Sequence, residues 1–222
     1  MKSATIIRTW KKLCLLFAFL LTRAHGNNTS CSSSELSFGK LDKNLKDLKN
    51  CLEDVSATWT TYQKANIFNQ LRFLTDIFQN HQTRELQNLL PVNCSAPAVP
   101  EDGGLLCAAA KNAIYCKPMC NAGYDFTFIR RSRLFEKCSA ATKYKWTTQF
   151  FGGNTLAICS KSHIAVSGAC SAYFPKSHDC HKIKSHEQLM KNITNIFQSE
   201  LAMADITQLS DPIILHCGYN KS

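Results

Sequence analysis

Residues 94–159 read CSAPAVPEDGGLLCAAAKNAIYCKPMCNAGYDFTFIRRSRLFEKCSAATKYKWTTQFFGGNTLAIC and contain six of the twelve cysteines in the 222-residue chain. A segment this short buries too little apolar surface to be stable alone, and disulfides are the usual remedy. Glycines at Gly103, Gly104, Gly123, Gly152 and Gly153 separate short apolar runs such as 124–129 and 146–151. The stretch therefore predicts a small disulfide-rich module of short β-strands and turns.

The first 26 residues have the pattern of a signal peptide. Basic residues precede an apolar run at 13–21, and small residues up to Gly26 offer a cleavage site. The run has about half of the roughly 20 residues that a membrane helix needs, and no other segment is apolar enough to span a bilayer. We therefore expect a secreted, extracellular protein with no membrane span, a compartment in which disulfides persist.

Removal of this leader changes the charge and the cysteine count. Five basic residues and no acidic ones leave with it, so the formal charge falls from +10 to +5. A mildly basic extracellular chain is no candidate for nucleic-acid binding. Cys14 also leaves, and the odd number of eleven remaining cysteines predicts at least one thiol that is free or bonded to another chain.

The secretory route also predicts glycosylation. Asn-x-Ser/Thr sequons begin at Asn27, Asn28, Asn93, Asn192 and Asn220. Cys94 fills the middle position of one of them and disfavours it. We expect glycans on Asn192 and on Asn27 or Asn28.

Residues 27–92 form the predicted helical region. Apolar or aromatic residues follow one another at alternating steps of four and three, which places them on one face of a helix. The first set is Leu41, Leu45, Leu48, Leu52, Val55, Trp59 and Tyr62. The phase shifts at Asn66, and a second set follows at Ile67, Leu71, Leu74 and Phe78. Pro91 ends the helical pattern.

Two interpretations of this stripe stay open. In one, it is a coiled coil that joins two chains into a homodimer. In the other, it is the internal core of an ordinary helical hairpin. Trp59 and Tyr62 fit a narrow dimer seam poorly, which favours the hairpin, whereas the regular spacing favours the coiled coil.

Residues 161–222 form a tail with a second amphipathic helix at about 186–208. Ser185 and Gln188 have the spacing of a capping box. The apolar residues of one face are Leu189, Ile193, Ile196, Phe197 and Leu201. We expect this helix to pack on the N-terminal helices, Pro212 to follow its end, and residues 213–215 to be extended. In that arrangement Cys217 would bond near Cys51 or Cys31.

The cysteine order of residues 94–159 resembles a sushi module, also called a complement control protein module. In these modules a Gly-Tyr pair follows the second cysteine, and a tryptophan lies between the third and fourth. The four matching cysteines are, in order, Cys94, Cys120, Cys138 and Cys159. Gly123, Tyr124 and Trp146 match the other positions. The match departs from the pattern in that Trp146 lies farther from the last cysteine than usual.

This resemblance implies a module over residues 93–160 with Cys94–Cys138 and Cys120–Cys159 bonds. The simplest use of the two extra cysteines is a Cys107–Cys116 bond. Helix followed by sushi module also resembles the N-terminal part of a fibulin, without the EGF repeats that follow it there. The expected fold class is α+β: a coiled-coil-like helical region, a disulfide-rich all-β module and a C-terminal amphipathic helix.

Catalytic and metal chemistry find little support in the sequence. His178, Cys180 and His181, with His186 nearby, have the residue types of a zinc site. We expect Cys180 to bond to Cys170 instead, and therefore predict no metal. Motifs of nucleophilic, zinc-peptidase or phosphate-binding sites are absent from the sequence, so we expect no cofactor and no enzyme activity.

A cluster of basic residues could bind a glycosaminoglycan, because sulfate pairs well with arginine. It consists of Arg130, Arg131, Arg133, Lys137, Lys143 and Lys145. Sushi modules as a family bind proteins and such polysaccharides. The leading expectation is a secreted binding protein that contacts an extracellular protein at the cell surface or in the matrix. The alternatives are a heparan-sulfate-binding matrix component and a helical signalling ligand.

Overall fold

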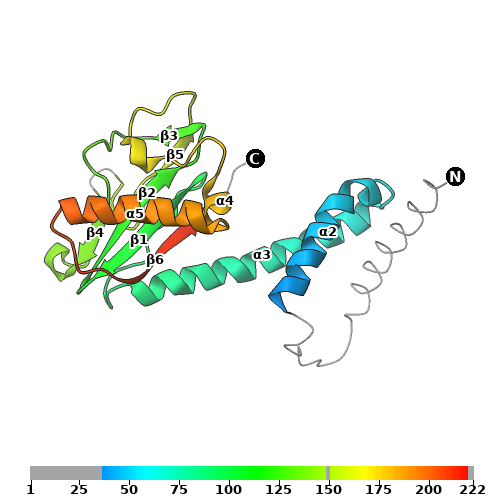
Figure 1. Ribbon diagram of the computed structural model, residues 1–222, viewed down its shortest axis with the longest axis horizontal. Coiled ribbons are helices and arrows are strands. Elements are labelled where there is room, and N and C mark those ends of the chain that lie inside the picture. The colour runs from blue at the N-terminus through cyan, green and yellow to red at the C-terminus, as the bar shows by residue number, and fades with distance from the viewer. Residues whose placement is uncertain (1–36, 149–150, 220–222) are drawn as a thin grey trace. The chain divides into compact units, whose positions relative to one another are not determined.

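Figure 1 shows the computed structural model, which describes residues 37–148 and 151–219. Helices combine with antiparallel sheets and four disulfides, which confirms the α+β, disulfide-rich class. The chain divides into two compact units, Met1–Thr75 and Asp76–Ser222. The expected signal peptide and the sequons at Asn27, Asn28 and Asn220 lie outside the described residues. Within the described ranges, no helix is both long and apolar enough to cross a membrane.

The first unit contains α2 (Phe38–Ser56) and the start of α3 (Thr61–Leu89), which continues into the second unit. The helical break falls at residues 57–60, and Asn66 lies inside α3. The reason is a capping box that the hydrophobic pattern does not display: the Gln63 backbone N–H donates to Thr60 Oγ1 (3.3 Å), and the Thr60 N–H donates to Gln63 Oε1 (2.9 Å).

The second unit is built on a four-stranded antiparallel sheet in the order β4-β2-β1-β6. Its strands are β1 (Gly103–Ala110), β2 (Ala113–Cys120), β4 (Glu136–Ser139) and β6 (Ser210–Cys217). The expected extended segment 213–215 lies within β6, which pairs directly with β1. The predicted domain boundary near residue 160 therefore divides a single sheet, because the predicted tail supplies β6, an edge strand of that sheet.

Both faces of this sheet are buried. Helix α5 (Glu187–Met203) crosses one face (Figure 1), where Ile193, Phe197 and Leu201 pack with Leu106 and Tyr115. On the opposite face, the core residues are Leu86, Leu105, Ile114, Trp146 and Leu156. Adjacent residues of β1 alternate between the two faces, as strand geometry requires, yet both kinds of position are apolar.

Helix α5 differs from its expectation at both ends. It ends at Met203 rather than near 208, and its N-cap residue is His186, whose side chain makes no capping hydrogen bond. Ser185 does not form the expected capping box, because its hydroxyl donates to the Lys182 carbonyl at 3.0 Å and closes the preceding α4 (Cys180–Lys184). The apolar face of α5 packs on the sheet, and not on the N-terminal helices as expected.

A second, two-stranded sheet pairs β3 (Tyr124–Phe126) with β5 (Cys159–Lys161). Only the first half of the expected strand 124–129 is therefore regular, and residues 146–148 are not in a strand. Two short 3-10 helices, Ala140–Thr142 and Cys170–Ala172, complete the described elements of the unit.

Four disulfides stabilise the second unit. They are Cys94–Cys138, Cys107–Cys116, Cys120–Cys159 and Cys180–Cys217. Cys94–Cys138 and Cys120–Cys159 are the pairs that the sushi resemblance implied, and Cys107–Cys116 is the bond expected for the two extra cysteines. The expected Cys170–Cys180 bond does not form, and neither does a bond from Cys217 to the N-terminal region. Helix α4 places Cys180 against the end of β6 instead, and Cys170 is left as an exposed thiol.

Gly103 and Gly104 make room for two of these bonds. A Cβ on Gly104 would lie 2.5 Å from the sulfur of Cys180, and one on Gly103 would lie 2.9 Å from the sulfur of Cys159. Real side-chain contacts do not come this close, so the glycine pair is required for the disulfides to lie against β1.

We expect Gly104→Ala to lower the free energy of unfolding by about 1–3 kcal/mol, since the added methyl group overpacks a rigid site. Chemical denaturation measures the loss, and disulfide mapping should show impaired Cys180–Cys217 formation. Gly39→Ala is the control: nothing lies within 4 Å of its added Cβ, and alanine in a helix is favoured over glycine by about 0.5–1 kcal/mol. An unchanged unfolding midpoint for Gly104→Ala would contradict this account.

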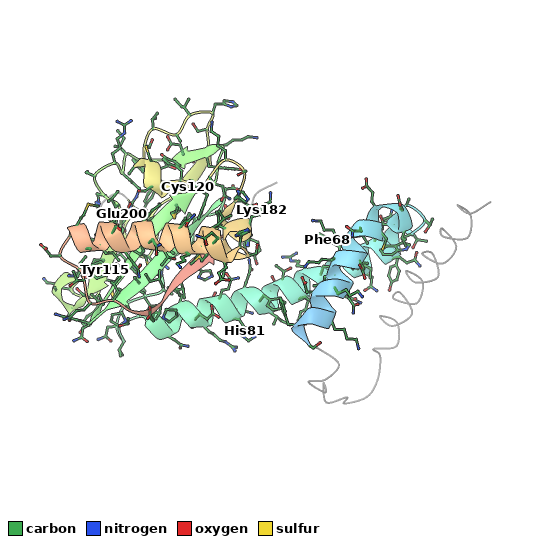
Figure 2. The ribbon with its side chains drawn as sticks, viewed as in Figure 1. Phe68, His81, Tyr115, Cys120, Lys182 and Glu200 are labelled. Atoms are coloured by element: carbon green, nitrogen blue, oxygen red, sulfur yellow. A yellow bond between two sulfur atoms is a disulfide. The ribbon has the colours of Figure 1, made fainter. Side chains whose placement is uncertain are left out.

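A buried ion pair joins α5 to β2. The Lys117 ammonium lies 2.7 and 2.6 Å from the two carboxylate oxygens of Glu200, whose place on α5 Figure 2 shows. The Ser171 hydroxyl donates to the same carboxylate at 2.5 Å. Burial lowers the pKa of Lys117, and the Glu200 charge opposes that shift. The lysine is only 1% exposed, so neither charge has water as an alternative partner.

Lys117→Met should destabilise the unit by about 3–5 kcal/mol, because it leaves the Glu200 carboxylate buried without its counter-charge. The double variant Lys117→Met with Glu200→Leu should recover most of that loss, since a matched apolar pair removes both charges. Lys191→Met, which changes an exposed lysine of α5, should stay within about 0.5 kcal/mol of the parent. Denaturant titrations of the parent and the three variants measure these losses. Equal losses of unfolding free energy for Lys117→Met and for the double variant would refute the role given to the ion pair.

Candidate binding surface

Asp125 organises the loop that follows the small sheet. Its carboxylate accepts backbone N–H groups from Phe126 (2.8 Å), Val166 (3.1 Å) and Ser167 (3.1 Å). It also accepts the hydroxyls of Ser167 (2.9 Å) and Tyr173. A carboxylate is suited to this position because all of its neighbours are donors. Val166 and Ser167 of the loop are therefore tied to β3 by this side chain.

The charge states of this cluster follow from the same contacts. Burial alone would raise the pKa of Asp125, but the hydrogen bonds from Tyr173, Val166, Ser167 and Phe126 outweigh it and hold the pKa below its ordinary value. Burial, and then the bond to Asp125, raises the pKa of Tyr173 to about 12. The phenol therefore stays protonated, donating to Asp125 while its oxygen accepts the Gly168 N–H at 2.6 Å.

Large apolar side chains lie exposed on the segments that this cluster fixes. They are Phe128 (41% exposed), Ile129 (73%), Ile158 (42%), Ile164 (66%) and Val166 (48%), and we call them the β3–β5 patch. The segments lie side by side: the Thr127 N–H donates to the Ile158 carbonyl (3.1 Å), and Arg131 Nε donates to the Val166 carbonyl (2.7 Å). Exposed apolar residues that gather in this way are typical of a surface that binds another molecule.

The charges around the β3–β5 patch are basic. Arg131 and Lys161 are exposed within its segments. The only acidic residue in 122–134 and 158–169 is Asp125, which is buried and already accepts several hydrogen bonds. The patch therefore offers apolar side chains beside positive charge, without an exposed carboxylate in these segments to offset it.

The predicted glycosaminoglycan-binding cluster is divided by the fold. Arg130 is 6% exposed and lies 2.9 Å from the Glu136 carboxylate, and Arg133 lies 2.7 Å from the same carboxylate. Thr147 donates to it as well, at 2.7 Å. The buried acid of β4 thus holds two of the arginines, and the inclusion of Arg130 in a surface site was wrong because its guanidinium does not reach solvent.

The remaining basic residues of that cluster lie nearer to water. Lys143 and Lys145 are exposed. Lys137 is half-buried, with its ammonium 5.6 Å from the centre of the Tyr115 ring. Trp146 lies in the core, where its indole N–H donates to the Ser95 carbonyl at 3.0 Å.

The histidine and cysteine cluster of the tail has structural partners. Cys180 is bonded to Cys217, His178 Nδ1 lies 2.7 Å from the Ser177 hydroxyl, and His181 Nε2 lies 3.1 Å from the Gly218 carbonyl. Over residues 37–148 and 151–219, no group of three or more His, Cys, Asp or Glu side chains is placed to hold a metal ion.

Asn192 is exposed on α5, and its side chain accepts a hydrogen bond from Gln188 at 3.1 Å. The next residue, Ile193, is buried against the sheet, so Asn192 points away from the core. A glycan there would meet no buried surface.

Comparison with known proteins found no family model, no curated protein and no solved structure that matches this chain. The sushi and fibulin resemblances therefore rest on the cysteine order and its neighbouring residues alone, and they stay predictions.

Sequence reasoning did not single out Asp125 or the β3–β5 patch. The patch residues stand in loops, where apolar side chains form no periodic pattern. The signal that was present is compositional: residues 122–134 contain three arginines and a single aspartate, and residues 158–169 contain a lysine and no acidic residue. That aspartate could have been suspected as structural because it has no acidic neighbour with which to share a site.

We expect Asp125→Asn to loosen residues 162–168, since an amide can accept at only one of the two oxygen positions and turns an N–H toward existing donors. The unfolding free energy should fall by about 1–3 kcal/mol, and amide exchange in this loop should quicken at least tenfold. Hydrogen exchange read by mass spectrometry measures both effects. Glu187→Gln, an exposed carboxylate of α5, is the control.

The same residue predicts a pH dependence. Because the folded pKa of Asp125 is depressed, its stabilisation is complete above the pKa of the unfolded state, about 3.9, and is lost as pH falls through the folded value. Asp125→Asn should therefore show a shallower loss of stability in this acid range than the parent. If the unfolding free energies of the parent and of Asp125→Asn fell by the same amount as the pH is lowered, the role given to Asp125 would be contradicted.

Proposed function

We propose that this chain is a secreted, non-enzymatic binding protein that contacts an extracellular protein through the β3–β5 patch. The observation that carries the proposal is the set of exposed apolar side chains beside positive charge, on loops that Asp125 fixes in place. A patch held in one conformation before binding loses less conformational entropy when it docks.

The disulfides support a role outside the cell. Four of them stabilise the second unit, and such bonds persist in oxidising compartments. The leader pattern of residues 1–26 and the sushi resemblance of residues 94–159 point in the same direction. A partner at a cell surface or in the matrix is the class of ligand that these features favour together.

The chemistry of the β3–β5 patch favours one class of partner. Apolar side chains next to Arg131 and Lys161 complement a protein surface that presents acidic residues around apolar ones, because opposite charges guide and orient the encounter. Heparan sulfate, the alternative, needs a row of free cations. Glu136 holds Arg130 and Arg133, which leaves fewer arginines for it.

The third alternative, a helical signalling ligand, would present the apolar face of an amphipathic helix. In α5 that face is occupied, since Ile193, Phe197 and Leu201 are buried against the sheet. The β3–β5 patch is therefore the better candidate for the second unit's contact with a partner.

The test is binding of the labelled, secreted chain to cultured cells and to the matrix that they deposit. We expect saturable binding that falls at least tenfold in the double variant Ile129→Asp with Ile164→Asp, as at a central apolar contact. The control is Ile196→Asp, which changes an exposed isoleucine of α5 (47% exposed) outside the patch and should leave binding intact.

Enzyme treatment of the cells separates the candidates. Binding that is lost after mild trypsin treatment and kept after heparinase supports a protein partner. Binding that is lost after heparinase would instead establish the heparan-sulfate alternative, and equal losses in the patch variant and the Ile196→Asp control would remove the β3–β5 patch from the account.

A further inference from the structure

Helix α2 has an apolar stripe without a core to cover it. None of its residues is buried, and none of the three buried clusters of the described chain includes a residue of α2. Leu41 is 39% and Leu45 is 49% exposed, and Leu48, Leu52 and Val55 are half-buried. Amphipathic helices of this length take most of their stability from burial of such a stripe, so α2 requires a further partner.

We propose that this partner is α2 of a second copy of the chain, packed antiparallel. With Phe38 included, the stripe alternates steps of three and four over the whole helix, the spacing of the two core positions of a coiled coil. When the second helix runs in the opposite direction, every core residue of one copy faces a core residue of the other. The layers are Phe38 with Val55, Leu41 with Leu52, and Leu45 with Leu48, each formed twice by symmetry.

The centre of this register coincides with the centre of the helix, so the same helix can form both halves of a two-fold interface. A two-fold interface requires that each residue meet its counterpart in the same way in both copies. The midpoint between Leu45 and Leu48 is also close to the midpoint of Phe38–Ser56. No apolar layer is therefore left overhanging at either end of the pair.

The charges beside the seam favour this orientation. Asp42 and Lys49 occupy the same flanking position in successive heptads, directly after Leu41 and Leu48. In the antiparallel pair, Asp42 of one copy lies nearest to Lys49 of the other, and the pair occurs twice. In a parallel pair the same two residues would face Ser37 and Asn44, which carry no charge, so only the antiparallel pair gains from electrostatics.

The rest of the surface of α2 does not oppose self-association. Four lysines and four acidic residues balance within the helix, so two copies meet without net repulsion. Asp42 already accepts the Lys46 ammonium of its own helix at 2.6 Å, and a carboxylate can accept a second lysine. This pairing does not depend on the β3–β5 patch or on its partner.

Sedimentation equilibrium of the secreted chain tests the association directly. We expect a monomer–dimer equilibrium whose dissociation constant rises at least tenfold in Leu45→Asp. Lys49→Glu should weaken the dimer about fivefold, because both interchain pairs become repulsive, and adding Asp42→Lys should restore it. Lys43→Glu, the same charge change on the face opposite the seam, is the matched control. Disulfide mapping of each variant verifies that the second unit is intact.

The direction of pairing has its own readout. Phe38 replaced by the photo-crosslinking residue benzoylphenylalanine should attach to the region of Val55 in the other copy; a mixture of ¹⁴N- and ¹⁵N-labelled chains identifies such links as interchain. A link to the region of residue 38 in the other copy, links within one chain only, or a monomer at every concentration would each overturn the proposal.

Discussion

The pairing of β6 with β1 is the contact on which the second unit depends. It brings Leu215 into the core beneath α5, and it places Cys217 where Cys180 can reach it. Without this strand, β1 would be an edge with unpaired backbone groups, and the apolar face that α5 covers would be incomplete. The cysteine-rich segment 94–159 is thus part of a larger unit whose last strand lies near the end of the chain.

The helices were more predictable from the sequence than the strands, for a physical reason. Helix α5 has one buried face and one wet face, so Ile193, Phe197 and Leu201 recur at helical spacing. Strands β1 and β2 are buried on both faces and read as nearly continuous apolar runs, without the alternation that marks a half-exposed strand. The other neighbour of β1 in the sheet is β6, which lies far away in sequence.

The disulfides also differ in how well the sequence predicts them. Cys107 and Cys116 face each other across a hairpin, so closeness in sequence is a good guide to their pairing. Cys180 bonds instead across the fold, and Gly104 leaves the space for its sulfur. Likewise, the number of basic residues gave no sign that Arg130 is buried, because Glu136, which neutralises it, lies on a strand whose position only the folded sheet defines.

The two proposed interactions have different physical origins. Cross-links and buried cores make the second unit a fixed platform, so the β3–β5 patch is exposed because other residues already stabilise the fold. The stripe of α2 is only partly covered, because none of its residues belongs to a buried cluster of the described chain. If α2 joins two copies, each dimer carries two patches. A cell surface or matrix displays many copies of its proteins, and two linked patches bind such an array far more tightly than one, through effective concentration and without any new contact.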